Sequence, residues 1–217
     1  MLKKILKGQE TSGLVYNALE EVYGMLEREE SMFKAVCDLL FLGKELTVDV
    51  LVQDENINMG ERMVRRMVFE HLSLNPKRDL PASVSLISVV HDAERIGDYT
   101  KSLLELVKWR SESFSEQEYC RSCSEIREKI EPLFGMTLEA FREGDSELAR
   151  EVMRRHREIK TQTDVYVESM MQDPDVGREG IVFSFASRFL RRISAHLSNI
   201  SSSIANPFDR IGKDDEP

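Results

Sequence analysis

The residues best placed to do chemistry are acidic side chains at helical spacing in the first half of the chain. Glu94 and Asp98 are four residues apart, and His91 precedes Glu94 by three. Because side chains three and four residues apart share one face of a helix, these groups point in the same direction. Carboxylate oxygens with an imidazole nitrogen suit iron, manganese, zinc or magnesium.

A second stretch offers a matching face. Asp54, Asn58 and Glu61 follow one another at spacings of four and three, and Asp54 and Glu61 interrupt an apolar stripe. If the two faces meet, four or five oxygen ligands converge, and a cation would relieve the mild repulsion between like charges. The competing interpretation is a solvated acidic face paired with nearby arginines. Those arginines are Arg62, Arg65 and Arg95.

The segments that carry these residues are predicted to be helices. Apolar residues recur every three or four positions in six segments, as in Val182, Phe185, Phe189 and Ile193, which is typical of amphipathic helices. No segment shows the strict alternation of a strand. Pro132 alone among the prolines falls inside a helical pattern, where it should kink a helix or mark its first turn. The predicted fold class is all-α, with antiparallel helices joined by short loops.

The order of the segments suggests an internal duplication. Residues 43–58 align with 144–160, and residues 93–103 align with 190–200. We therefore predict two tandem three-helix bundles. Their predicted boundaries are 1–110 for the first bundle, 111–205 for a second, divergent bundle and 206–217 for a short polar tail.

Composition narrows the classes of function. The net charge of −9 argues against nucleic acid, whose binding needs a basic patch. No segment approaches the roughly 18 apolar residues of a membrane span, and no apolar run after the first lysines suits a signal peptide. Three cysteines, an odd number, fit a reducing compartment. We expect a soluble, cytoplasmic protein that reaches membranes only through partners.

Cys120 and Cys123 form a CxxC motif. A thioredoxin-type site needs a βαβ context, and a zinc site needs two further soft ligands, whereas only Cys37 remains. We interpret the motif as incidental to the start of a helix.

Residues 75–107 carry a more specific pattern. Pro76 is followed by Asp79-Leu80 and then by a helical segment with the box Glu94-Arg95-Ile96-Gly97-Asp98. With Ile57-Asn58 in the preceding segment, this pattern resembles the signature of the PhoU family of phosphate-uptake regulators. The resemblance in order and length spans nearly the whole chain, and its specific motifs lie almost entirely in the first half.

The resemblance implies a pair of three-helix bundles that regulates phosphate uptake and homeostasis by protein–protein interaction, and that is not an enzyme. The implied partners are a phosphate transporter component, either an ATPase subunit or a sodium–phosphate cotransporter, and a sensor histidine kinase. A homodimer is also implied. So is a metal ion or cluster in the first bundle, for which the candidate ligands are Glu94, Asp98, Asp54, Asn58, Glu61 and His91.

The second half departs from the acidic pattern. The positions opposite Asp54, Asn58, Glu94 and Asp98 hold His156, Lys160, Arg191 and Ala195. We predict that Arg191 and Arg192 bind an anionic group, either phosphate or an acidic partner surface, because guanidinium suits oxyanions. The alternative is that arginines of this region form salt bridges within the bundle, to acids such as Glu151 and Glu158.

Two other classes of function stay open. One is a helical scaffold or adaptor with a vestigial metal site. The other is a di-metal carboxylate oxidase, which would need Glu-x-x-His pairs that this chain lacks.

Overall fold

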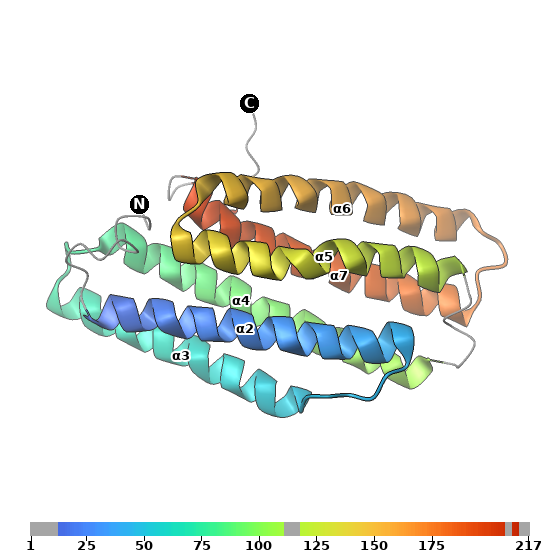
Figure 1. Cartoon of the computed structure of the whole chain (residues 1–217), viewed down its shortest axis with the longest axis horizontal. Coiled ribbons are helices and arrows are strands. Elements are labelled where there is room, and N and C mark those ends of the chain that lie inside the picture. Colours follow the sequence, from blue (N-terminus) through green and yellow to red (C-terminus); the bar gives the residue numbers. More distant parts are fainter. Residues whose placement is uncertain (1–12, 111–117, 207–209, 213–217) are drawn as a thin grey trace.

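The computed structural model describes residues 13–110, 118–206 and 210–212. Within these ranges the chain forms long α-helices and no strand, which confirms the all-α prediction. The helices are α2 (Gly13–Leu42), α3 (Val50–Leu74), α4 (Leu80–Leu106), α5 (Glu118–Glu143), α6 (Ser146–Gln172) and α7 (Arg178–Ala205), with a 3-10 turn η1 (Val107–Trp109) after α4 (Figure 1). None of these helices combines the length and apolarity that crossing a membrane requires.

Local sequence explains where helices start and stop. Asp49 and Asp145 cap α3 and α6, and each side chain accepts hydrogen bonds from two backbone N–H groups of the first turn. Gly43 and Gly144, at φ 67° and 62°, take the left-handed conformation at the turns between helices. Pro132 lies inside α5, well past its first turn, so the first-turn alternative was wrong.

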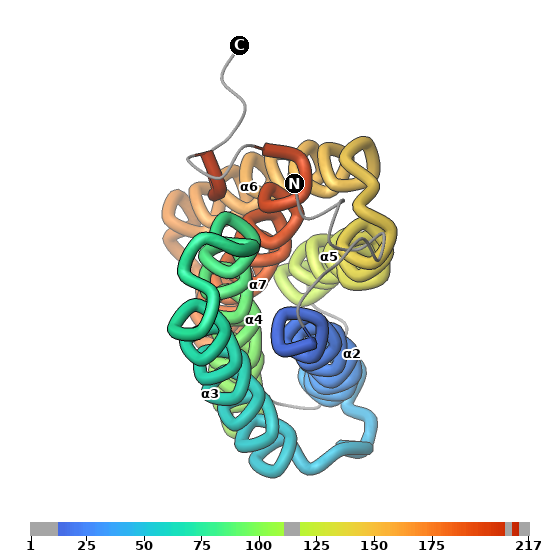
Figure 2. The backbone as a smooth tube through the Cα atoms, turned by 90° about the vertical axis from the view of Figure 1, so that its left-hand side faces the viewer, coloured from blue at the N-terminus to red at the C-terminus, as the bar shows by residue number. Residues whose placement is uncertain are grey.

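The helices pack as two groups around one continuous core. Helices α2, α3 and α4 lie on one side and α5, α6 and α7 on the other, with α4 against α7 and α2 against α5 (Figure 2). Aromatic pairs cross between the groups: the rings of Phe33 and Phe134 are 5.0 Å apart, and those of Phe41 and Phe183 are 5.8 Å apart. The division at residue 110 stays a prediction, because this shared core joins both groups and residues 111–117 lie outside the described ranges. Most of the predicted tail also lies outside them.

A polar link lies within the contact between α4 and α7. Asp92 is 8% exposed, and its Oδ1 accepts hydrogen bonds from His196 Nδ1 at 2.7 Å and Asn199 Nδ2 at 3.0 Å. The ring of Tyr99 stacks on His196, with 5.6 Å between centroids. This link fixes how α4 is rotated against α7, because a buried carboxylate needs its donors.

Replacing Asp92 with Ala should lower the free energy of unfolding by about 1–3 kcal/mol, because His196 and Asn199 would lose a buried acceptor. Urea denaturation measures this change. The matched control is Glu105→Ala on the exposed side of the same helix, which should change stability by less than about 0.5 kcal/mol. Equal urea midpoints for the two variants would show that the link contributes nothing.

Candidate metal centre

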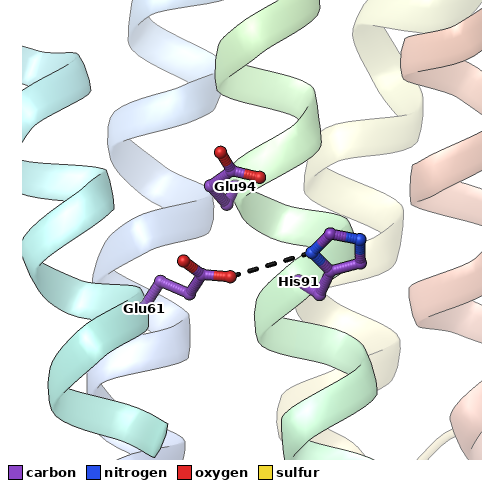
Figure 3. A group of neighbouring side chains, drawn as sticks. All are labelled: Glu61, His91 and Glu94. Carbon is purple, nitrogen blue, oxygen red and sulfur yellow. Dashed lines mark ion pairs between the residues drawn. The ribbon is translucent and has the colours of Figure 1, made fainter.

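Helices α3 and α4 bring three of the predicted ligands together. Glu61 lies on α3, and His91 and Glu94 lie one turn apart on α4 (Figure 3). Glu61 Oε1 is 3.7 Å from His91 Nδ1, and one ligand atom from each of the three residues lies within 4.8 Å of the other two. Both carboxylates are largely covered and the imidazole is half exposed, so the cluster opens to solvent on the histidine side.

The other three predicted ligands gather around a lysine beside this cluster, and Asp98 stays in contact with Glu94. Lys101 Nζ lies 2.9 Å from both Asp54 Oδ1 and Asp98 Oδ1. Asn58 Nδ2 donates to the other oxygen of Asp54 at 3.2 Å. Burial alone would lower the pKa of Lys101, but its hydrogen bonds to the two aspartates outweigh burial and raise that pKa.

Two of the three arginines named by the competing interpretation, Arg65 and Arg95, lie along the outer edge of the acidic face, whereas no ion pair of Arg62 is seen among the described residues. Arg65 approaches Glu61 to 2.7 Å, and Arg95 approaches Asp98 to 3.2 Å and Glu94 to 3.7 Å. Both arginine side chains are about half exposed, and surface pairs of this kind contribute roughly 0–1 kcal/mol. Burial, with Asp98 and Glu61 nearby, nevertheless raises the pKa of Glu94, while Arg95 acts in the opposite direction. Arg95 therefore does not cancel the effect of burial and of the neighbouring carboxylates on the pKa of Glu94.

Glu29 of α2 is a buried acidic residue, within electrostatic influence of Glu94, that the spacing argument missed. Its side chain is fully buried, and neither carboxylate oxygen has a hydrogen-bond partner within the part of the chain that the structure describes. Burial raises its pKa well above the usual range, and the charge of neighbouring Glu94 raises it further, with Arg28 opposing both. The sequence did indicate that Glu29 is buried, because it lies three residues after Leu26 and four before Phe33, on the apolar stripe of the helix.

This set of donors fits a divalent cation. Glu61, His91 and Glu94 each offer one ligand atom, and the orphaned carboxylate of Glu29 lies beside Glu94. Buried carboxylates without donors are rare in folded proteins, because an isolated negative charge is strongly destabilised there. A set of oxygen and nitrogen ligands suits iron, manganese, zinc and magnesium. The ligand types alone do not select one of these metals.

The equivalent region of the second half has its charges paired internally. His156 Nδ1 lies 2.9 Å from Ser194 Oγ. Arg191 forms an ion pair with Asp164 across α6 and α7. Arg154 and Arg155 both pair with Glu151 at the helical spacing that the alternative interpretation required.

Arg192 differs from these arginines, because it is exposed and pairs with no acidic side chain in the ranges described. Arg191 could reach an anion only in competition with Asp164. That Arg191 and Arg192 bind an anion stays a prediction.

The cysteines are buried core residues. Cys37, Cys120 and Cys123 are free thiols, and burial raises the pKa of each. Cys123 Sγ lies 3.7 Å from the carbonyl oxygen of Phe183. Thiols that stay protonated and covered are poor nucleophiles and poor metal ligands, in agreement with the interpretation of the CxxC as incidental.

Solved structures define the class of fold. The chain matches the crystal structure of PhoU from Pseudomonas aeruginosa with a TM-score of 0.77 at 21% identity, covering 88% of this chain and 95% of that one. It matches the phosphate transport system regulatory protein PhoU from Streptococcus pneumoniae with a TM-score of 0.75 at 19% identity, covering 88% and 92%. The fold is therefore that of the PhoU-like helical proteins.

Sequence comparison identifies the family. The model of the PhoU domain matches residues 22–107 and 124–204. The chain is 30% identical to the phosphate-specific transport system accessory protein PhoU homolog of Pseudomonas putida over 185 residues, 82% of this chain and 71% of that protein. A homolog of the same name from P. aeruginosa is 28% identical over 187 residues, 82% and 75%. The chain belongs to the PhoU family, and this membership confirms a regulatory accessory protein, not an enzyme.

The pH dependence of stability tests the burial of Glu29. In metal-free protein held with a chelator, Glu29→Gln should become more stable than wild type as pH rises above about 4.5, the unfolded pKa. The sign follows because the folded pKa is raised: the wild type is most stable while Glu29 is protonated and loses that stability towards the folded pKa. The difference in free energy of unfolding between Glu29→Gln and wild type should grow by at most about 1.4 kcal/mol per pH unit.

Urea unfolding from pH 4 to 8 provides the measurement. Glu30→Gln removes the same charge one residue away and separates a local effect from the change in net charge. Parallel stability curves for wild type and Glu29→Gln would contradict the burial of an unpaired carboxylate.

Proposed function

We propose that this chain is a cytoplasmic regulator of phosphate uptake that binds a phosphate transporter component, a sensor histidine kinase, or both. The observation that carries the proposal is the PhoU domain match in both halves of the chain. Relatives from two Pseudomonas species are named as accessory proteins of the phosphate-specific transport system. The transporter component is an ATPase subunit or a sodium–phosphate cotransporter, and the regulator works as a homodimer of the 25.0 kDa chain.

An apolar surface near the junction of α4 and α7 supports binding to another protein. A pocket of about 540 Å³ there is lined almost wholly by apolar side chains. Three of them, Trp109, Ile181 and Phe185, are at least half exposed. Lys108 and Arg178 lie beside this surface and pair with no acidic side chain in the described ranges. Exposed apolar groups gathered in this way mark interaction sites.

A pull-down with tagged protein from phosphate-replete and phosphate-starved cells tests the proposal. Wild type should recover a phosphate transporter component or a sensor kinase, in amounts that change with phosphate. Phe185→Ser should reduce that recovery at least about tenfold, since hot-spot aromatics contribute about 2 kcal/mol or more. The control Phe69→Ser removes an exposed phenylalanine on α3, 75% exposed against 54% for Phe185, and should leave recovery unchanged.

Recovery of neither partner from a folded bait, in either condition, would overturn the regulatory proposal and favour the scaffold. Recovery lost with Phe69→Ser and kept with Phe185→Ser would move the interface to α3.

We also propose that the regulator binds one divalent metal ion, of iron, zinc, manganese or magnesium, through Glu61, His91 and Glu94. The support is the convergence of three donors beside the orphaned carboxylate of Glu29. A bound ion would supply positive charge there, while the two glutamates and the histidine hold it between α3 and α4. A scaffold with a vestigial site is the alternative.

Titration calorimetry with Mn²⁺ on chelator-treated protein tests the metal centre. Glu94→Gln should weaken binding at least about tenfold, the loss seen when supporting groups of metal sites are removed. Glu70→Gln, on the exposed side of α3, should bind as wild type does. If wild type takes up no Mn²⁺, Fe²⁺, Zn²⁺ or Mg²⁺, the site is vestigial.

A further inference from the structure

The outer face of α3 carries several exposed apolar side chains. This helix packs against α2 and α4 and lies on the outside of the molecule (Figure 2). Leu51, Met59, Met63 and Phe69 are between 46% and 75% exposed. At 100° per residue they fall within an arc of about 120° on the side opposite buried Val64. Exposed apolar groups gathered on one face mark an interaction site, and methionine adapts its shape to a partner.

The charged side chains of this outer face have no ion pair within the described residues. Glu55 and Arg66 lie inside the same arc, and both are exposed. On the neighbouring side of the helix Glu61 and Arg65 do pair, at 2.7 Å. Arg62 and Arg66 are four residues apart, so their like charges repel mildly. An acid from another molecule would relieve this repulsion, and a base from that molecule would pair with Glu55.

The outer face of α3 is complementary to itself when one copy is reversed. In an antiparallel pair of α3 helices, apolar side chains meet apolar side chains, an acid meets a base, and methionine meets methionine. The pairs are Leu51 with Phe69, Glu55 with Arg66 and Met59 with Met63. Their midpoints fall at positions 60, 60.5 and 61, so a single register brings all three pairs together. A twofold dimer requires such a match, because the same patch is used on both subunits.

We propose that a second copy of this chain docks on the outer face of α3, with the two α3 helices antiparallel about a twofold axis near position 60. This inference rests on the homodimer of the proposed function and names its interface. Glu55 pairs with Arg66 of the partner subunit on each side of the axis, and the methionines lie between the two ion pairs.

The interface on α3 leaves the surface for the regulatory partner open. The apolar pocket there is lined by residues of α4, η1, α7 and the turn before α7. Loss of the dimer would therefore leave that pocket intact in each chain, in agreement with the control role of Phe69→Ser in the pull-down.

Sedimentation velocity of the full-length chain, over about a hundredfold range of concentration, tests this interface. Wild type should sediment at twice the 25.0 kDa mass of the chain. Glu55→Arg and Arg66→Glu each place like charges opposite one another and should raise the Kd of the dimer at least about tenfold. The double variant Glu55→Arg/Arg66→Glu should restore the dimer, which also excludes misfolding as the cause of its loss. The matched control Glu125→Arg, at an exposed position on α5, should leave the Kd unchanged.

The outcomes separate this interface from the proposed function. A wild-type dimer that neither single variant weakens overturns the α3 interface and leaves the homodimer standing. A dimer lost with Phe185→Ser and kept with Glu55→Arg does the same, because the second copy then binds at α4 and α7. Loss in both single variants without rescue in the double variant overturns the antiparallel register. A wild-type monomer at every concentration overturns both the interface and the homodimer, whereas binding to a transporter component or kinase is decided by the pull-down.

Discussion

The position of α4 is the constraint on which both polar sites depend. This helix packs against α2, α3 and α7, and it carries Asp92 and Glu94 on nearly opposite sides, about 200° apart at 3.6 residues per turn. Asp92 meets His196 and Asn199 of α7, while Glu94 lies with Glu61 of α3 and near Glu29 of α2. A rotation of α4 that loosened one site would therefore disturb the other.

The acidic cluster is held in place by apolar packing, because its own charges oppose the fold. An unpaired buried carboxylate such as that of Glu29 destabilises the folded state, and Glu94 adds like charge beside it. Buried Leu26 and Phe33, one turn away on either side of Glu29, each stabilise the fold by roughly 1.5–3 kcal/mol. A cation that bound only the folded chain would offset the remaining repulsion by mass action. This physical link connects the proposed metal centre with the stability of the first three helices.

Periodicity was enough to predict the helices. The alternative of salt bridges within the second bundle named Glu151 as an acceptor, and Arg154 and Arg155 both contact it. Contacts between helices were harder to predict from the sequence. Arg191 pairs with Asp164 of the neighbouring helix, and the long side chain of Lys101 reaches across to Asp54 of α3. Neither contact follows from one-dimensional spacing. Glu29 lies in the charged run 27–30, and only its position on the same helix face as the apolar stripe distinguishes it from its neighbours.

The two halves repeat the same order of helices with different chemistry. In the first half the acidic face keeps an unpartnered carboxylate, whereas in the second half Arg191 and His156 are engaged by Asp164 and Ser194. A metal-dependent signal would then arise only in the first three helices. One direct contact with the second half is through α4, since Glu94 and Asp92 share that helix and Asp92 binds α7; another is through α2, where Phe33 packs on Phe134 of α5. Any coupling between the proposed metal centre and a partner near Phe185 would have to pass through these contacts between the two groups of helices, and not through either group alone.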